Sequence, residues 1–253
     1  MLLGIDCGNT KTKWAVFNPT GEISEFGSCL NSQLSDAALP HAINYQRVII
    51  SNVANAALGA CLIERLTETD MPIHSLQSPA SMGGWRNHYE PAQSLGCDRF
   101  AAMMGAFHKV NSSCVVVNVG TAVTIDALSI KNKHADFLGG LILPGLHLMQ
   151  NSLAQATAQL PDNAWQSNLH SVGIFAKNTL DAMQVGAVAA IIGAIQQMAT
   201  ALAAHDQHAP HILISGGDAA LIKTHLTLTT PCSMVDNLVL HGLYCIDRIR
   251  QSE

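Results

Sequence analysis

Small and polar residues follow the first apolar run of the chain, in a pattern that could bind phosphate. Residues 2–5 and 14–17 are apolar, so the segment predicts two strands joined by a polar turn. Gly8 would let the turn approach a ligand closely, and the side chains that follow it add donors and positive charge. Asp6, at the end of the first strand, could hold a hydrated magnesium ion beside the phosphates. A plain hairpin turn is the alternative, because short glycine motifs are common.

A second segment, residues 114–126, repeats this plan of strand, polar turn and strand. Aligning Gly8 with Gly120 pairs residues of similar size: Asp6 with Asn118, Asn9 with Thr121, and Thr12 with Thr124. Two such units in one chain suggest an internal duplication, although two Val/Ile/Gly strands can also resemble each other by chance. A nucleotide lying between two such turns would have its phosphates held from both sides.

A third candidate for chemistry is Asp98, which lies between a polar loop and an apolar helical pattern at 100–110. A carboxylate in that position favours a helix start, so Asp98 could be an N-cap paired with Arg99. It could instead accept a proton from a substrate hydroxyl, with Arg99 binding an anionic group of the substrate as a bidentate fork. The spacing alone favours the cap.

The composition excludes several classes of protein. The chain has 253 residues and a net charge of −5, without a Lys/Arg block, which argues against a nucleic-acid surface. No stretch approaches the roughly 20 uninterrupted apolar residues of a membrane span, and no signal peptide is visible. Seven dispersed cysteines suggest reduced thiols. We therefore expect a cytoplasmic protein with no membrane and no nucleic-acid partner.

The rest of the chain alternates strand and helix patterns, which predicts an α/β fold. Strands are expected at 47–53, 137–145 and 211–215, and helices at 34–39, 56–67, 100–110, 146–159, 178–204, from 219 onward and 234–243. Residues 78–95 are expected to form a long loop. The best boundary falls in the polar connection 109–113, which gives an N-terminal domain of residues 1–112 and a C-terminal domain of residues 113–253.

Several short motifs, in this order, resemble those of the type III pantothenate kinases. They extend through almost the whole chain: Asp6-Cys7-Gly8-Asn9-Thr10, Tyr89 with Gly96-Cys97-Asp98-Arg99, Gly120-Thr121-Ala122 with Thr124 and Asp126, Gly139-Gly140 with Pro144-Gly145, Thr157-Ala158 with Leu160-Pro161, and Asp236-Asn237. Each motif is weak by itself, but their common order is specific. The resemblance implies two related ribonuclease H-like domains of the actin/Hsp70/sugar-kinase (ASKHA) fold, with ATP in the interdomain cleft.

The resemblance also implies roles for individual residues. Thr121 would contact ATP from the second loop, and the first ATP phosphate loop would consist of Asp6, Cys7, Gly8, Asn9, Thr10, Lys11, Thr12 and Lys13. Asp98 would be the proton acceptor, which now outranks the N-cap interpretation. The pantothenate site would comprise Tyr89, Gly96, Cys97, Asp98, Arg99 and Thr179. Thr179 lies near a subunit interface in the family, whose enzymes are homodimers.

One position departs from the family pattern. An Asp usually stands two residues before the Gly-Thr of the second loop and helps to hold K⁺ or NH₄⁺, whereas this chain has Asn118. The amide oxygen of Asn118 can coordinate a cation but brings no formal charge, which puts activation by potassium in doubt.

The resemblance predicts ATP- and Mg²⁺-dependent phosphorylation of pantothenate to 4'-phosphopantothenate, the first step of coenzyme A biosynthesis. Two other functions remain open. One is a kinase or phosphatase of the same fold that acts on another small molecule, since the fold alone does not fix the substrate. The other is a non-catalytic transcription accessory factor of the same family.

Overall fold

The chain folds into two compact units and contains two sheets. The structure is a computed structural model that describes residues 1–41, 44–67, 71–156, 173–227 and 230–252. Unit 1 comprises Met1–Asn111, Asn132–Phe137 and Asn237–Glu253, and unit 2 comprises Ser112–Lys131 and Leu138–Asp236. The predicted boundary near residue 112 agrees with the first of these divisions.

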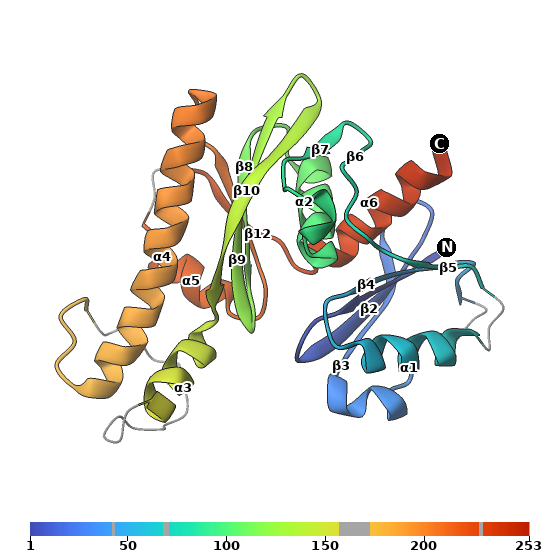
Figure 1. Ribbon diagram of the computed structural model, residues 1–253, viewed down its shortest axis with the longest axis horizontal. Helices are drawn as coiled ribbons and strands as arrows, with labels where there is room; N and C mark the ends of the chain where they lie inside the picture. Colours follow the sequence, from blue (N-terminus) through green and yellow to red (C-terminus); the bar gives the residue numbers. More distant parts are fainter. Residues whose placement is uncertain (42–43, 68–70, 157–172, 228–229, 253) are drawn as a thin grey trace. The chain divides into compact units, whose positions relative to one another are not determined.

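Unit 1 is built on a five-stranded sheet in the order β3-β2-β1-β4-β5 (Figure 1). Its strands are β1 (Leu2–Cys7), β2 (Lys11–Phe17), β3 (Ile23–Leu30), β4 (Arg47–Asn52) and β5 (Ile73–Ser75). β1 pairs antiparallel with β2 and parallel with β4, so the β1–β2 turn and the end of β4 lie at the same edge of the sheet. The predicted first hairpin is confirmed.

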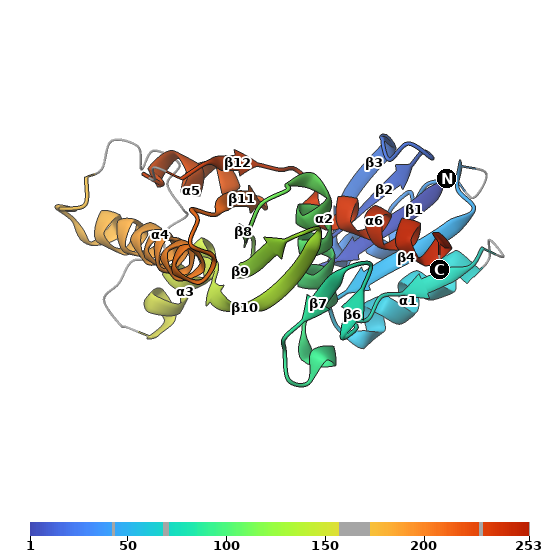
Figure 2. The same cartoon turned by 90° about the horizontal axis from the view of Figure 1, so that it is seen from above.

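Helices cover both faces of this sheet (Figure 2). The helical segments of unit 1 are η1 (Asn31–Asp36), α1 (Ala56–Thr67), η3 (Ala92–Ser94), α2 (Cys97–Lys109) and α6 (Leu238–Ser252). Side chains of β1 alternate in direction, so that Leu3 and Ile5 pack with Leu62 of α1. Gly4 points to the other face, where a Cβ would lie 3.7 Å from Leu243 of α6.

Two glycines let α2 and α6 pack at very short range. A Cβ on Gly242 would lie 1.7 Å from the backbone oxygen of Ala101, and one on Gly105 would lie 2.7 Å from that of Leu238. Such clashes with backbone atoms leave room only for glycine. The C-terminal helix is thereby part of unit 1, which differs from its assignment to a domain of residues 113–253.

Unit 2 repeats the sheet of unit 1. Its strands are β8 (Cys114–Val119), β9 (Ala122–Lys131), β10 (His134–Pro144, of which the residues up to Phe137 belong to unit 1), β11 (His211–Ser215) and β12 (Cys232–Met234). They are neighbours in the order β12-β11-β8-β9-β10 within a seven-stranded sheet, which continues from β10 to β7 (Trp85–Asn87) and β6 (Ser81–Met82). Read from β10 to β12, this order reproduces that of β3 to β5 in unit 1. β8 pairs antiparallel with β9 and parallel with β11, as β1 does with β2 and β4. The predicted duplication is confirmed at the level of topology.

The register corrects one detail of the predicted repeat. Cys7 pairs with Thr12 across the first turn, whereas Val119 pairs with Val123 across the second. The second turn is therefore one residue shorter, and the counterpart of Thr12 is Val123 and not Thr124.

The helices in the described part of unit 2 are α3 (Leu146–Ala156), α4 (Thr179–Asp206) and α5 (Ala219–His225). α4 packs one face against β8 and β9, with Val188, Ile191 and Ile195 in the buried cluster. Within the described chain, α4 is the one helix long and apolar enough to cross a membrane by length and composition. The core helix of a soluble protein passes the same test, so this finding carries little weight.

Several predicted elements differ from the structure. The segment 78–95 is not a plain loop, since it contains the short hairpin β6 (Ser81–Met82) and β7 (Trp85–Asn87), and β7 pairs with the start of β10. The segment 34–39 lies partly in a 3₁₀ helix that begins at Asn31, and the helix predicted at 234–243 begins at Leu238. The Thr157-Ala158 and Leu160-Pro161 motifs and the end of the predicted helix 146–159 lie outside the described residues.

Candidate active site

The carboxylate of Asp6 lies at the end of β1, beside the end of β4. Asp6 and Ser51 are partners in the parallel register, and the Ser51 hydroxyl hydrogen-bonds the Asp6 carboxylate. Burial raises the pKa of Asp6 to about 7, and the nearby charge of Asp98 adds to this effect against the opposing effects of Lys13 and Ser51. Asp6 thus holds a proton far more readily than an ordinary aspartate.

Asp98 lies in the first turn of α2, and the N-cap of that helix is Gly96. The N-cap interpretation of Asp98 is therefore wrong. Asp98 Oδ1 accepts a hydrogen bond from the backbone N–H of Arg99 at 2.8 Å, and its side chain is partly exposed. Burial raises the pKa of Asp98 above its usual value, although the N–H and the charge of Arg99 oppose the shift. A partly exposed carboxylate with a raised pKa is suited to accept a proton from a bound hydroxyl.

Cys97 packs beneath this pair of carboxylates. Its thiol lies 3.4 Å from the Ser51 hydroxyl and 3.5 Å from the backbone oxygen of Asn52. Burial raises the pKa of the Cys97 thiol, which keeps it protonated and unreactive near neutral pH. Cys97 therefore ties the start of α2 to the end of β4 and is not a nucleophile.

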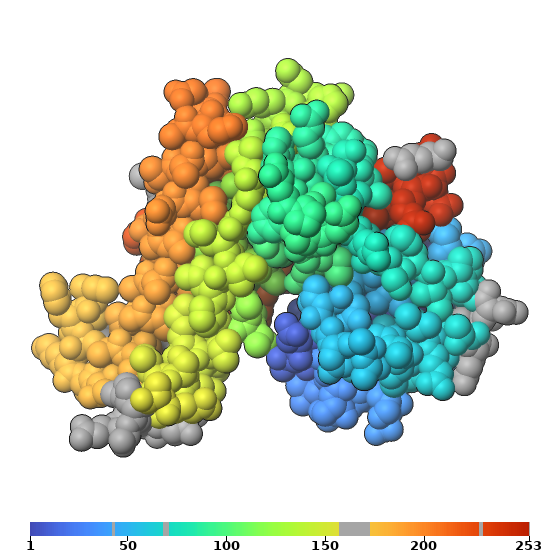
Figure 3. Space-filling view, in the orientation of Figure 1, coloured from blue at the N-terminus to red at the C-terminus, as the bar shows by residue number. Residues whose placement is uncertain are grey.

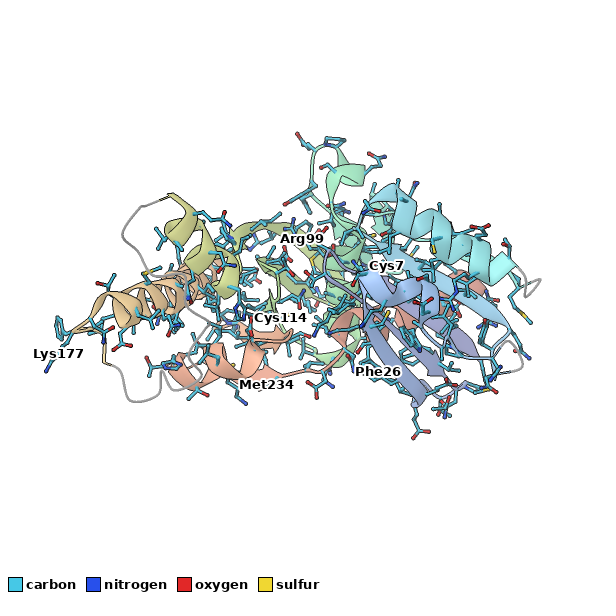
Figure 4. The ribbon with its side chains drawn as sticks, turned by 90° about the horizontal axis from the view of Figure 1, so that it is seen from below. Cys7, Phe26, Arg99, Cys114, Lys177 and Met234 are labelled. Carbon is cyan, nitrogen blue, oxygen red and sulfur yellow. The ribbon has the colours of Figure 1, made fainter. Side chains whose placement is uncertain are left out.

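Arg99 forms the centre of an aromatic cluster next to Asp98. Its guanidinium lies 5.3 Å from the ring centroid of Tyr89 and 5.8 Å from that of Phe137, within range of cation–π attraction. It also donates a hydrogen bond to the Tyr89 hydroxyl at 3.0 Å. Figure 4 labels Arg99 on α2 and Cys7 at the end of β1. The structure thus brings together Asp6, Tyr89, Asp98 and Arg99, which the sequence predicted as site residues, within unit 1.

The first loop exposes most of its predicted phosphate ligands. Asn9, Thr10 and Lys11 are exposed, and Lys13 is half-buried and stands opposite Asp6 in the β1–β2 register. Thr12 is fully buried, and its hydroxyl donates to Asn31 Oδ1 at 3.0 Å. The side chain of Thr12 therefore holds the loop, and its role as a nucleotide contact stays a prediction.

The acidic pair at the edge of the unit 1 sheet fits a magnesium ion. Among the described residues, Asp6 Oδ1 is one of three buried side-chain nitrogen or oxygen atoms that have no hydrogen-bond partner. An orphaned carboxylate oxygen beside a second carboxylate is a site where a cation lowers the electrostatic energy. No group of three or more His, Cys, Asp or Glu suited to a metal occurs in the described chain. This is consistent with magnesium, which keeps several waters and binds through one or two carboxylates and phosphate.

The second predicted loop lies in unit 2, where two glycines support it. A Cβ on Gly145 would lie 2.1 Å from the backbone oxygen of Gly120, and the N–H of Gly145 donates to Thr121 O at 2.9 Å. Thr121 is exposed at the tip, and Asn118 is half-buried at the end of β8. These contacts fix the loop in a conformation that presents Thr121 to solvent.

Thr179 is exposed in the first turn of α4, next to the N-cap Asn178. Asn178 accepts a hydrogen bond from the backbone N–H of Asp181 at 2.9 Å. The predicted contact of Thr179 with substrate stays a prediction.

Sequence reasoning missed three residues that hold this site together: Ser51, Asn31 and Asn87. Ser51 was placed in a strand that opens onto a loop, and its position in the register with Asp6 would have been the signal. Asn31 and Asn87 lie outside every quoted motif, because their hydrogen bonds join segments that are distant in sequence.

Comparison with known proteins identifies the family. A sequence model of the type III pantothenate kinases matches residues 2–201 of this chain. The chain belongs to the type III pantothenate kinase family. Curated type III pantothenate kinases from Methylobacillus flagellatus and Herminiimonas arsenicoxydans are 38% and 39% identical to it, over 98% and 97% of each chain.

Solved structures that resemble this type III pantothenate kinase family member establish its fold. A putative Baf family transcriptional activator from Campylobacter jejuni superimposes with a TM-score of 0.61 at 20% identity, covering 99% of this chain and 100% of that one. A putative N-acetylmannosamine kinase from Listeria monocytogenes superimposes with a TM-score of 0.56 at 13% identity, over 98% of both chains. The predicted ASKHA fold is confirmed.

Proposed function

We propose that this chain performs the reaction of its family, the transfer of the γ-phosphoryl group of ATP to pantothenate, which yields 4'-phosphopantothenate and starts coenzyme A biosynthesis. The observation that carries the proposal is the Asp6–Asp98 pair beside the Tyr89–Arg99 cluster. A family member without catalytic activity would have no need of an acidic pair with a buried, unpartnered carboxylate oxygen, which costs stability.

Asp98 acts as the general base in this proposal. Its carboxylate accepts the proton of the terminal primary hydroxyl as that oxygen bonds to the γ-phosphorus and the bond from phosphorus to the ADP oxygen breaks. The position of Asp98 in the first turn of α2 gives it access to a bound alcohol. Arg99 and Tyr89, with Gly96 and Cys97 beside them, bind pantothenate, and the guanidinium of Arg99 attracts its carboxylate.

The exposed tip of the first loop binds the phosphates of ATP through backbone N–H groups and the side chains of Asn9 and Thr10. Lys11 and Lys13 add positive charge, and Thr121 contributes from the second loop. Magnesium, held through water by Asp6, supplies charge neutralisation to the phosphates when it is bound. Phosphoryl transfer depends on such positioning and charge stabilisation more than on covalent help from the protein.

An ADP-release assay with the purified protein tests this function. We expect ADP to form with ATP, magnesium and pantothenate, and to remain at background without pantothenate. Release of ADP with another small alcohol and not with pantothenate would favour the same-fold kinase instead. No turnover with any alcohol in a substrate panel would favour a regulator.

We also propose that Asn118 contributes its amide oxygen to a monovalent-cation site for K⁺ or NH₄⁺. Because this oxygen carries no formal charge, we expect weaker potassium stimulation than an aspartate would give. Asn118→Asp should therefore increase the ratio of turnover with potassium to turnover with sodium. An unchanged ratio would remove position 118 from the cation site.

The protein is, in this proposal, a cytoplasmic homodimer that binds neither membrane nor nucleic acid. Support for the dimer comes from α4, whose outward face has small, exposed residues at Ala182, Gly186, Ala190 and Gly193. Small residues at helical spacing let a second helix approach closely. Thr179 lies on the same helix, next to the proposed interface. Figure 3 shows α4, in orange, at the surface of unit 2.

A further inference from the structure

We infer that Asn31 and Asn87 are positioning residues, each of which holds one substrate loop in its binding geometry through hydrogen bonds to that loop. Asn31 acts on the nucleotide loop and Asn87 acts on the loop that carries Tyr89. The inference rests on the proposed function, because it assigns ATP to the first loop and pantothenate to the second.

Asn31 holds the first loop at three points. Its Nδ2 donates to the backbone oxygen of Gly8 at 2.8 Å, and its Oδ1 accepts from the hydroxyl of Thr12 at 3.0 Å. Its backbone N–H donates to Thr10 O at 3.0 Å. Both polar groups of the side chain are thus committed to the loop.

The first loop depends on this support because its tip is exposed. Within the turn itself, the backbone bond that the structure describes runs from the Gly8 N–H to Lys11 O at 3.1 Å. Asn31 comes directly after β3, whose last residue, Leu30, pairs with Lys11 of β2, so the sheet fixes the backbone from which the Asn31 side chain reaches the loop. Removing its side chain would leave the Gly8 oxygen and the buried Thr12 hydroxyl without these partners, and the loop would sample other conformations.

Asn87 holds the second loop in the same manner. It is 8% exposed at the end of β7, and its Nδ2 donates to Ala92 O at 2.9 Å and to Pro79 O at 3.3 Å. Its Oδ1 accepts from the backbone N–H of Tyr89 at 3.0 Å. One side chain therefore joins both ends of the segment between Tyr89 and Ala92 and ties it to the preceding strand connection.

The position of Tyr89 determines that of its phenol, which accepts the hydrogen bond from Arg99. Loss of the Asn87 side chain should therefore loosen the Tyr89–Arg99 contact without touching Asp6, Asp98 or the first loop. A displacement of about 1 Å at a binding group is enough to change kinetic constants strongly.

The experiment compares Asn31→Ala and Asn87→Ala with wild type by steady-state kinetics, each substrate being varied while the other is saturating. We expect Asn31→Ala to raise the KM for ATP about tenfold, with the KM for pantothenate within about twofold of wild type. Asn87→Ala should raise the KM for pantothenate about tenfold and leave the KM for ATP within about twofold of wild type. A general loss of stability would lower kcat or both affinities together, and so would not produce this crossed pattern.

Asn18→Ala is the matched control for Asn31→Ala. Asn18 lies in the turn at the opposite end of the β2–β3 pair, where its Oδ1 accepts from the backbone N–H groups of Thr20 and Glu22 at 3.0 Å and 2.9 Å. Its loss removes a comparable set of turn hydrogen bonds far along the strands from the loop. We expect the control to lower thermal stability and to leave both KM values unchanged.

Amide hydrogen exchange gives a second readout that needs no turnover. We expect faster exchange in residues 8–12 for Asn31→Ala and in residues 88–95 for Asn87→Ala, each confined to its own loop. If exchange changes as expected but wild type does not phosphorylate pantothenate, the proposed function fails and the positioning roles stand. If wild type is active and neither KM moves selectively, the positioning roles fail.

If an alanine variant does not fold, the same kinetic comparison uses Asn31→Ser or Asn87→Ser, each of which keeps one polar group. The same KM pattern at smaller amplitude would support the inference. If both variants at one position fail to fold, that asparagine is a structural residue and the inference is wrong for it.

Discussion

At the scale of single residues, the candidate site has two carboxylates with raised proton affinity, Asp6 and Asp98. Asp6 has little solvent around it, and the charge of Asp98 lies close enough to oppose its ionisation. Such an arrangement destabilises the folded protein near neutral pH and is retained where chemistry requires it. Both residues are half-buried, and the Oδ1 atom of Asp6 is buried without a hydrogen-bond partner. In the proposed function, this unpartnered oxygen is the reason for assigning the cation to Asp6 and the proton transfer to Asp98.

Replacing Asp98 by asparagine tests its role as base. Asp98→Asn keeps the size of the side chain and its oxygen acceptor toward the Arg99 N–H, so the fold should be unchanged. We expect kcat to fall about 10²–10⁴-fold, the usual contribution of a general base, with a small change in the KM for ATP. Asp36→Asn, at an exposed position, is the control and should retain full activity. Turnover of Asp98→Asn close to wild type would exclude Asp98 as the base.

Replacing Asp6 by asparagine tests how much the charge of Asp6 destabilises the folded protein. The folded pKa of Asp6 is about 7, above the usual 3.8, so stability falls as pH rises from about 4 to about 7 and is lowest above 7. Asp6→Asn removes this penalty. In the absence of nucleotide and metal, we expect it to raise Tm at pH 8 by about 2–4 °C or more. Its effect at pH 4 should be much smaller.

Calorimetry at the two pH values makes this measurement. An equal change in Tm at pH 4 and pH 8 would contradict the raised pKa. The same variant should lose phosphoryl transfer, which would separate the contribution of Asp6 to function from its effect on stability.

At the scale of elements, the apolar spacing of the sequence predicted those helices and strands whose bounds depend on neighbouring residues in the chain. The helix Ala56–Thr67 was predicted with its observed bounds, because its apolar spacing matches the face that packs on the sheet. The start of α2 was predicted three residues late, because Cys97, Asp98 and Arg99 read as loop. Their helical conformation depends on Cys97 packing against Ser51 and Arg99 packing against the rings of Tyr89 and Phe137.

The sequence was least informative where segments distant in sequence meet. Gly105 of α2 and Gly242 of α6 were not singled out. The need for glycine at these positions is visible only when the backbone of the opposing helix is known. The pairing of β7 with β10 is equally invisible in a short polar segment. The motifs of the candidate site were predictable because each one is continuous along the chain.

The C-terminal end of α4 offers a stability prediction at this scale. Asp206 is buried there and is bound by the side chains of Lys131, Ser113, Ser129 and His205. Burial alone would raise the pKa of Asp206, but these hydrogen bonds outweigh it and hold the pKa well below its usual range. The resulting stability is present at pH values above the unfolded pKa near 4 and is lost as pH falls below it.

We therefore expect Asp206→Asn to destabilise the protein by about 2 kcal/mol at pH 7 and by a smaller amount at pH 3, because the stabilisation is lost fully only below the folded pKa. Asp181→Asn, at the other end of α4, is the control and should change stability little, because Asp181 is more exposed and its charge is not required to hold a strand. Urea unfolding at the two pH values measures both variants. Equal destabilisation by Asp206→Asn at pH 3 and pH 7 would show that packing and not charge is responsible.

At the scale of the whole molecule, the chain consists of two units with one repeated sheet order. The units differ where function requires it: unit 1 holds the acidic pair and the aromatic cluster, and unit 2 carries α4. Duplication of a sheet thus provided two similar turns, and the first of them adjoins the Asp6–Asp98 pair.

The proposed dimer can be tested on the outward face of α4. A Cβ at Gly186 or Gly193 would have no heavy atom within 4 Å, so a larger side chain there leaves unit 2 intact. Gly193→Glu should therefore convert a dimer into a monomer of normal helical content, as measured by light scattering with size-exclusion chromatography. Gly193→Ala is the matched control and should remain dimeric. A dimeric Gly193→Glu would place the interface elsewhere.

The packing of α6 into unit 1 has a consequence for synthesis on the ribosome. Residues 138–236 emerge as one uninterrupted segment and include most of unit 2, whereas the sheet that carries the acidic pair lacks its last helix until residues 237–252 leave the exit tunnel. The strands of unit 1 that are synthesised first therefore wait for α6, which follows most of unit 2 in the sequence, before their sheet is complete.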